Sequence, residues 1–318
     1  MKTMMLVFLM LAGVARAQSN QGFAFYGSPQ MKWTLPANNL HMQDNPSRVA
    51  NITEQRFNQI VDEVMSIWIP VAAQKGINLT ATKRWSDPTV NASASQSGKT
   101  WLVTMYGGLA RRPEVTEDGF ALVVCHELGH HFGGYSFYGR TDWASAEGES
   151  DYFATNACAK YLWGKDMQRN SLYKRLRQTP PIVQQACDAV WNGNANAQAW
   201  CVRTALGGHS LATLLSAIGG RRAAPSFETP DKTVVNKTSV SHPQAQCRLD
   251  TYFAGALCVS KWDINTIPGK AHPKGQDSPD AEKEAMKYSC FAATGAKVGY
   301  RPACWFKGLN SAFNVNYR

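Results

Sequence analysis

Amphipathic periodicity divides the first third of the chain into one expected helix and two expected strands. In TEQRFNQIVDEVMSIWI the apolar residues recur every three or four positions, which predicts a helix that is capped by Thr53 and ends at Pro70. Between residues 77 and 106 the apolar residues alternate, in INLTATKRW and again in TWLVTMY, which predicts strands separated by a turn rich in Ser, Asn and Gly. Gly107 and Gly108 are expected to end or bulge the last strand.

The rest of the chain is expected to be mainly helical. Thr116 can cap a helix through EDGFALVVCHELGHHF, whose first turn carries two acidic residues, as the helix dipole favours. A second helix is expected from about residue 143 to 161. Residues 181–220 are expected to be helical in pieces, 221–241 irregular and 242–260 helical again. Helices combined with alternating strands predict an α/β (α+β) fold that contains a mixed sheet.

The N-terminal pattern predicts export from the cytoplasm. MKTMMLVFLMLAGVARAQS has one lysine, an apolar run from Met4 to Ala15, and a small-x-small pattern that ends at Ala17. These features predict a signal peptide over residues 1–17, cleaved after Ala17. Residues 18–50 are rich in Asn, Gln, Ser and Pro and are expected to form an extended lead-in. The apolar run is too short to cross a bilayer as a helix, and we expect no membrane span.

Composition and charge narrow the class of partner. Apolar residues make up 44% of the 318 residues, which permits a sizeable core, and charged residues make up 18%. The formal net charge is +10, but the basic residues are scattered along the chain. We therefore expect no nucleic-acid partner. A solvated basic surface is favoured, and attraction to an anionic cell envelope or an acidic substrate stays open.

The eight cysteines fit an oxidising compartment, because an even count in an exported chain favours disulfides. Cys187 with Cys201, and Cys290 with Cys304, would each close a short loop. The alternative is that some of the cysteines are buried free thiols. The protein is therefore expected to be secreted or periplasmic.

Two further cysteines cannot pair with each other. Cys247 and Cys258 are expected on one helix, where eleven residues at ~1.5 Å each would separate them beyond the reach of a disulfide. They are therefore expected to pair elsewhere, with Cys125 and Cys158 as the candidates.

The stretch VVCHELGHHFGG carries the candidate chemistry. His126 and His130 are four residues apart, so on a helix they share one face and can bind one metal ion. Glu127 lies beside them, placed to act on a ligand at the fourth coordination position. His131 is rotated by about 100° from His130 and is not expected to join the site. The alternative is two histidines that are hydrogen-bonded in a core helix.

The third metal ligand decides the class of site. The metzincin pattern requires a third histidine where this chain has Ser136, so that pattern fails. A glutamate from the following helix, in EGESD, is the alternative. Glu147 shares a semi-apolar face with Asp151, whereas Glu149 lies on a face that we expect to be solvated. We therefore expect Glu147 as the ligand, and Asp151 as the group that accepts a hydrogen bond from a ligand histidine.

These motifs together resemble a known peptidase group. H-E-x-x-H followed by E-x-x-x-D resembles the gluzincin zinc peptidases, and EGESD resembles the E-x-E-A-D element of the HtpX, CaaX prenyl protease and BepA-like family. A downstream His-Pro with an arginine six residues after the histidine also matches, at His242 and Arg248. The resemblance implies a zincin-like metallopeptidase domain over residues 51–260 with a helical C-terminal lobe. Residues 261–318 are expected to form a disulfide-stapled segment packed on the same domain.

The resemblance also implies a cofactor and a role for each residue of the site. One Zn²⁺ per chain would be held by the two motif histidines and Glu147, with Glu127 as general base towards a water molecule. His242 would donate to the oxyanion, and Arg248 would orient groups or stabilise charge. Two alternatives for His242 stay open: an ordinary histidine at a helix start, and a ligand of the open zinc position in a resting state.

A secreted or periplasmic zinc-dependent endopeptidase is the expected function. The strand within residues 100–108 is expected to be the sheet edge that pairs with an extended polypeptide substrate. The alternative is a last strand without substrate contact. Two other functions stay open: a catalytically silent zincin that acts as an envelope binding or chaperone-like protein, and a zinc amidase on cell-wall peptide crosslinks.

Overall fold

The computed structural model describes residues 30–44, 51–138, 143–173, 178–220, 223–272, 275, 277–292 and 295–309. The expected signal peptide and part of the expected lead-in lie outside these residues. The strands are β1 (Gln30–Trp33), β2 (Asn78–Arg84), β3 (Ala92–Ser97) and β4 (Thr100–Tyr106). The helices are α1 (Glu54–Gln74), α2 (Gly107–Ala110), α3 (Glu117–Phe132), α4 (Glu147–Phe153), a π-helical turn (Ala154–Cys158), α5 (Ala159–Trp163), α6 (Met167–Tyr173), α7 (Pro181–Val190), α8 (Ala195–Ile218), α9 (Ala245–Leu257), α10 (Pro279–Ala285) and a 3₁₀ turn (Met286–Tyr288).

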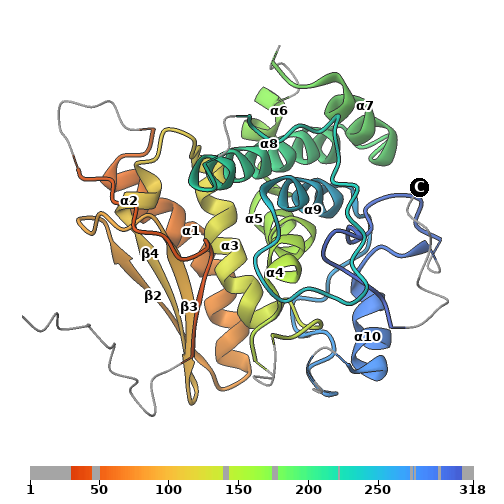
Figure 1. Ribbon diagram of the computed structural model, residues 1–318, viewed down its shortest axis with the longest axis horizontal. Coiled ribbons are helices and arrows are strands. Elements are labelled where there is room, and N and C mark those ends of the chain that lie inside the picture. Colours follow the sequence, from red (N-terminus) through yellow and green to blue (C-terminus); the bar gives the residue numbers. More distant parts are fainter. Residues whose placement is uncertain are drawn as a thin grey trace, which may run out of the picture.

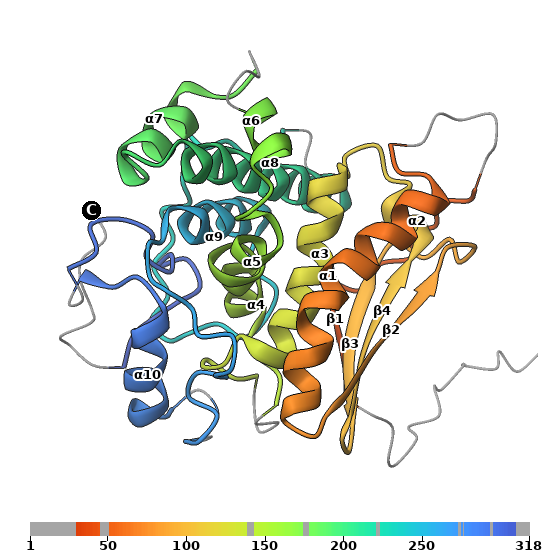
Figure 2. The same cartoon turned by 180° about the vertical axis from the view of Figure 1, so that it is seen from behind.

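A mixed four-stranded sheet and a helical C-terminal part confirm the expected α+β class. Figures 1 and 2 show the sheet at one side of the molecule, with α3 between the sheet and the helices α4, α5 and α9. The helix α1 packs against β2, and α3 packs against β3 and β4. This arrangement places the helix of the HELGH motif at the centre of the fold. No helix within the described residues is long and apolar enough to cross a membrane.

The sheet has the strand order β1-β3-β4-β2. The strands β3 and β4 form an antiparallel hairpin, β1 pairs antiparallel with β3, and β2 pairs parallel with β4. The strand β3 occupies the Ser-rich stretch that the sequence pattern assigned to a turn, and that assignment was wrong. Its sequence ASASQS has no large apolar residue, so the alternation was invisible. Its small side chains are nevertheless mostly buried, because α3 packs directly on this strand.

The strand β4 is an interior strand, which corrects the expected edge over residues 100–108. It pairs with β2 along its whole length and with β3 from Thr100 to Met105. It therefore offers no free main-chain edge to a polypeptide. The strand ends at Tyr106, directly before Gly107 and Gly108, as expected, and the two glycines begin the short helix α2. A Cβ atom on either glycine would lie within 2 Å of a main-chain oxygen, 1.8 Å from that of Trp85 or 1.9 Å from that of Pro88, so this turn requires glycine.

The helix α1 begins as expected and extends beyond its expected end. The Thr53 side chain accepts a hydrogen bond from the Arg56 amide, as an N-cap does. The helix continues through Pro70 to Gln74. Pro70 lies on the exposed side, while the next two residues, Val71 and Ala72, are buried in the core. Packing of this last turn therefore outweighs the hydrogen bond that proline removes.

The helical part follows the expected order, with shifted boundaries. The expected helix over 143–161 begins at Glu147 and runs through α4, the π-helical turn and α5 to Trp163. The helix α9 is shorter than the expected 242–260, and the described residues of 221–241 contain no helix or strand, as expected. Residues 181–220 form the two helices α7 and α8.

Four disulfides use all eight cysteines, and they are Cys125–Cys158, Cys187–Cys201, Cys247–Cys304 and Cys258–Cys290. The expected pair Cys187–Cys201 is confirmed. The expected pair Cys290–Cys304 is wrong, and Cys125 and Cys158 pair with each other rather than with cysteines of α9. Cys125 lies on α3 beside the π-helical turn that carries Cys158, with their Cα atoms 5.7 Å apart. The C-terminal segment packs on α9, so its cysteines meet those of that helix.

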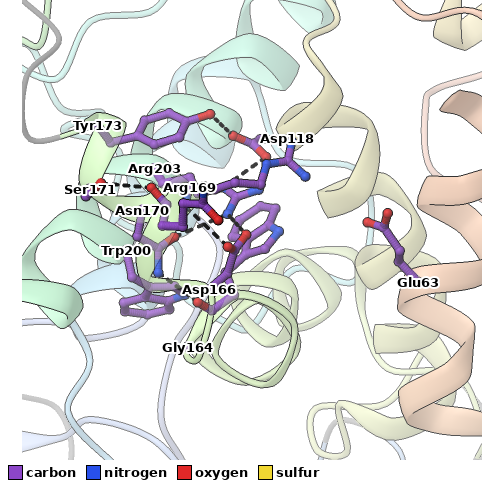
Figure 3. A network of polar contacts seen from close by, with 12 residues as sticks. Glu63, Asp118, Gly164, Asp166, Arg169, Asn170, Ser171, Tyr173, Trp200 and Arg203 are labelled. Atoms are coloured by element: carbon purple, nitrogen blue, oxygen red, sulfur yellow. Dashed lines mark hydrogen bonds and ion pairs between the residues drawn. The ribbon is translucent and has the colours of Figure 1, made fainter.

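A buried polar network ties the N-terminal end of α3 to α8 (Figure 3). Arg203 donates from Nε and Nη2 to Oδ1 of Asp118, at 3.0 and 2.8 Å, and from Nη1 to Asp166 at 3.0 Å. The Tyr173 hydroxyl donates to the other oxygen of Asp118. Only 1% of Arg203 is exposed. This network fixes the start of the motif helix from one side.

Candidate metal centre

Two helices bring three buried ligand groups together. The helix α3 presents His126 and His130 on one face, and α4 presents Glu147 towards them. One Glu147 oxygen lies 3.3 Å from Nε2 of His126, and the other lies 3.8 Å from Nε2 of His130. In a tetrahedral zinc site, ligand atoms about 2.0–2.1 Å from the metal are roughly 3.3–3.5 Å apart. The three groups therefore have the spacing of a metal-binding triad.

Hydrogen bonds fix both histidines in the form that binds metal through Nε2. Nδ1 of His126 lies 2.8 Å from Oδ1 of Asp151, and Nδ1 of His130 lies 2.9 Å from the main-chain oxygen of Ser145. Because these oxygens only accept, each Nδ1 carries a hydrogen. Each Nε2 is thereby the atom that faces Glu147. The Ser150 hydroxyl, 3.0 Å away, is a further contact of Nδ1 of His130.

Five buried polar atoms of the triad and of the neighbouring Glu127 have no hydrogen-bond partner. This set consists of Nε2 of His126, Nε2 of His130, Oε2 of Glu147 and both carboxylate oxygens of Glu127. Buried polar atoms are nearly always hydrogen-bonded in folded proteins, so such a group of unpaired atoms is exceptional. Two imidazole nitrogens and one carboxylate are a donor set that zinc accepts. The residues present therefore fit a zinc ion.

The electrostatics of the triad favour the ligand forms of two of its members. Burial lowers the pKa of His130 to about 4, so this ring is neutral at neutral pH. Burial opposes the charge of Glu147, but the neighbouring His130 and His126 outweigh it and lower its pKa to about 2. Burial also opposes the charge of His126, but Asp151 outweighs it and raises its pKa to about 9. Metal binding would displace that proton.

Arg248 holds Asp151 from α9. Its Nε and Nη2 atoms donate to the two Asp151 oxygens at 2.6 Å each, and both side chains are buried. Nη1 donates to the main-chain oxygen of Thr34 at 2.8 Å. This fork fixes the carboxylate that orients His126. Arg248 thus bonds to the site chiefly through Asp151, and its Nη2 also lies 3.4 Å from Nδ1 of His126.

His242 lies at the outer side of the triad. Its Nε2 is 3.5 Å from Oε2 of Glu147 and 2.7 Å from the main-chain oxygen of Trp33. Since a carbonyl oxygen only accepts, this Nε2 carries a hydrogen and is not a ligand in this arrangement. The side chain is 27% exposed, whereas the triad itself is almost fully buried. His242 and the end of β1 therefore lie next to the triad at its more accessible side.

Glycine within the motif permits the close approach of α3 and α4. A Cβ atom on Gly129 would lie 2.7 Å from Cα of Ser150. Any larger residue at this position would push α4, and Glu147 with it, away from the histidines. The second position of the HELGH spacer is thus fixed by packing. Helical periodicity carries no signal for this contact.

Glu149 is buried and ion-paired, which corrects the expected solvated charge. Its carboxylate accepts hydrogen bonds from Nε and Nη2 of Arg301, at 2.6 and 2.8 Å, and it is 0% exposed. The helical wheel placed Glu149 correctly on the face away from the metal. It could not show that the C-terminal segment covers that face.

His131 lies outside the triad, as its rotation on the helix predicts. Its ring stacks on Trp101 and Trp143, with centroids 5.0 and 5.5 Å away. Gln96 lies 3.1 Å from its Nδ1. Burial lowers the pKa of His131 to about 3, so the ring is a neutral part of the packing between the sheet and α3.

Comparison with known proteins returned no relative. No family model, no curated protein and no solved structure matches this chain. The functional proposal therefore depends on the geometry of the site and on the motifs that carry it.

Proposed function

We propose that this protein is a zinc-dependent hydrolase, with endopeptidase as the activity that the site supports best. The observation that carries the proposal is the group of unpaired, buried ligand atoms on His126, His130 and Glu147. The HELGH and EGESD motifs favour peptide bonds as the substrate. The four disulfides fit a secreted or periplasmic location.

Zinc in such a site supplies Lewis-acid chemistry, which lowers the pKa of a water molecule and polarises a carbonyl group. Glu127 is the residue that moves the proton: it follows a ligand histidine directly, and its two oxygens have no competing hydrogen-bond partner. Burial raises the pKa of Glu127 well above its usual value, with Glu147 adding to the rise. A carboxylate with a raised pKa is a stronger proton acceptor, as a general base requires.

The residues around the triad would orient its ligands and stabilise the charge that develops on the substrate. Asp151 holds the His126 ring in its ligand form, and Arg248 holds Asp151. His242 carries a hydrogen on Nε2 at the outer side of the triad, where it would donate to a developing oxyanion. In this arrangement the Trp33 carbonyl occupies that donor, so a substrate carbonyl would have to replace it.

The sheet topology supports β1 as the strand that would bind a polypeptide substrate. Because β4 is paired on both sides, a polypeptide would pair with an edge strand. β1 is the edge that lies beside the site, since its end contacts His242 through Trp33 and is followed by Thr34, which contacts Arg248. We place an extended polypeptide along β1.

The unpaired, buried carboxylate of Glu127 favours an enzyme over a catalytically silent binding protein. A zincin kept only for binding has no need of an unpaired buried carboxylate, which costs about 1–3 kcal/mol of folding free energy. An amidase on cell-wall peptide crosslinks would use the same residues. Only a substrate test separates it from a peptidase.

The test is metal content and hydrolysis on the same purified samples. One zinc per chain, together with cleavage of casein that Glu127→Gln abolishes, would support the peptidase. Zinc with cleavage of peptidoglycan crosslinks but not of casein would move the proposal to the amidase. Zinc with cleavage of neither would favour the binding protein, and a chain without zinc would overturn the proposal.

A further inference from the structure

The face of α4 that points away from the triad is held by the C-terminal segment. Residues 289–292 and 295–306, named here the C-terminal clamp, contact α4 at Gly148, Glu149 and Tyr152. We infer that Arg301 of this clamp is a positioning residue for the metal centre, because it fixes the helix that carries Glu147. The inference depends on the proposed metal site.

The first contact is the buried ion pair of Glu149 and Arg301. Its two hydrogen bonds, at 2.6 and 2.8 Å, use the fork geometry of the guanidinium group. Three aromatic rings surround the guanidinium carbon, with centroids 5.1–5.4 Å away, and they belong to Tyr152, Phe291 and Phe306. A charge pair enclosed in this way has one well-defined geometry. Glu149 is thereby held in position and direction.

The second contact is steric. The Trp305 ring lies so close to α4 that a Cβ atom on Gly148 would be 2.2 Å from it. The third contact is the Tyr152 hydroxyl, which donates to the Gly299 carbonyl at 2.6 Å and accepts from the Cys290 amide at 3.2 Å. Gly148, Glu149 and Tyr152 of α4 are therefore all constrained from the side opposite the triad.

The clamp is itself covalently fixed to α9. The disulfides Cys247–Cys304 and Cys258–Cys290 join it to the beginning and the end of that helix. The same helix carries Arg248, which binds Asp151 on the metal side of α4. The helix α9 thus connects the two groups that hold α4: the clamp on one face, and Arg248, through Asp151, on the other.

The first turn of α4 needs such support. Glu147 and Glu149 lie at the beginning of a helix that continues to Trp163, and its N-cap residue Ala146 makes no side-chain capping hydrogen bond. Metal sites tolerate displacements of only about 0.5 Å, so a small shift of α4 would move Glu147 out of place. Substitutions around a metal site typically lower metal affinity about 10–100-fold. We expect a loss of this size for Arg301, which does not touch the metal ligands.

The experiment compares Arg301→Lys with Arg203→Lys in the full chain. Arg203 is equally buried and also paired with carboxylates, but its partner Asp118 lies about 12 Å from His126 along α3. Zn²⁺ affinity is measured by chelator competition, and the geometry of the site by the visible absorption of the Co²⁺-loaded protein. Both are recorded at a temperature where circular dichroism finds each variant folded.

Arg301→Lys is expected to lower Zn²⁺ affinity about 10–100-fold and to change the Co²⁺ spectrum. Arg203→Lys is expected to leave both within about threefold, since distant sites act independently. If Arg301→Lys does not fold, Glu149→Leu/Arg301→Met, which removes both buried charges, replaces it. Wild-type affinity and spectrum in the folded Arg301 variant would overturn the inference alone. A wild-type chain that binds no metal would overturn the proposed function, and the inference with it.

Discussion

The polar network around Arg203 and the candidate metal centre have similar components. They differ in whether their buried polar atoms have hydrogen-bond partners. Both contain a buried arginine that binds an aspartate, Asp118 in one case and Asp151 in the other. In the network of Figure 3, the Asp118 oxygens are bonded to Arg203 and Tyr173. In the metal centre, five atoms of the histidines and glutamates have no partner.

This difference distinguishes a network whose polar groups are all paired from a site whose unpaired groups can bind a ligand. A buried polar atom without a partner costs about 1–3 kcal/mol, and folding does not tolerate several of them in one place without a reason. A metal ion in the triad would provide that reason for the nitrogens and for Glu147. A water or substrate proton would provide it for Glu127. The predictions below test this distinction, in order of their expected effect on the metal centre.

Removal of a ligand should have the largest effect. Glu147→Ala leaves two histidines, and two protein ligands do not hold zinc at structural affinity. We expect stoichiometric zinc in the wild type and less than about a tenth of it in the variant after dialysis against a chelator, measured by elemental mass spectrometry. A variant that retains the wild-type zinc content would show that the three groups are not the site.

Removal of the general base should abolish turnover and spare the metal. Glu127→Gln preserves the shape of the side chain but takes up no proton at neutral pH. Hydrolysis should fall about 10²–10⁴-fold, whereas zinc content should stay at one per chain. Measuring hydrolysis and zinc content on one sample separates a loss of catalysis from a loss of the metal. Unchanged hydrolysis in Glu127→Gln would contradict the assignment.

Weakening the support of a ligand should have an intermediate effect. Arg248→Lys keeps the charge next to Asp151 but cannot form two parallel hydrogen bonds. Asp151 would then hold the His126 ring less firmly. Zinc affinity should fall about 10–100-fold in chelator competition. If affinity stays within about threefold, Asp151 does not need the fork, and the role of Arg248 is limited to packing.

The network of Figure 3 should affect stability and leave the metal centre intact. Arg203→Met leaves Asp118 and Asp166 without their cation, and breaking a buried pair costs about 3–5 kcal/mol of unfolding free energy. Denaturant unfolding should record that loss, with zinc affinity near the wild-type value. A comparable loss of zinc affinity would mean that the start of α3 and the triad are coupled, which would remove the distinction between the two regions.

Local patterns predicted the elements whose contacts lie close in the sequence. The helix α3 was predictable because Thr116 caps it and its apolar residues continue to the motif. His126 and His130 follow from a four-residue spacing, and Glu147 and Asp151 follow from the face of a single helix. The disulfide Cys187–Cys201 closes a short loop and was predictable for the same reason.

Contacts between distant segments were beyond the reach of these patterns. The strand β3 was missed because its burial comes from α3 and the neighbouring strands, not from large apolar residues. Glu149 is buried rather than solvated because Arg301, 152 residues away, pairs with it and covers it. The remaining disulfides were mispaired because their partners depend on how α3, α9 and the C-terminal segment pack.

The sequence by itself thus determined the candidate ligands His126, His130 and Glu147, since helical periodicity fixes which side chains share a face. Only the tertiary structure decided that β4 is an interior strand, that β1 lies beside the triad, and that α4 is held from both sides. The physical reason is that periodicity specifies the direction of a side chain on its own element. What that side chain meets depends on which distant segment packs against it.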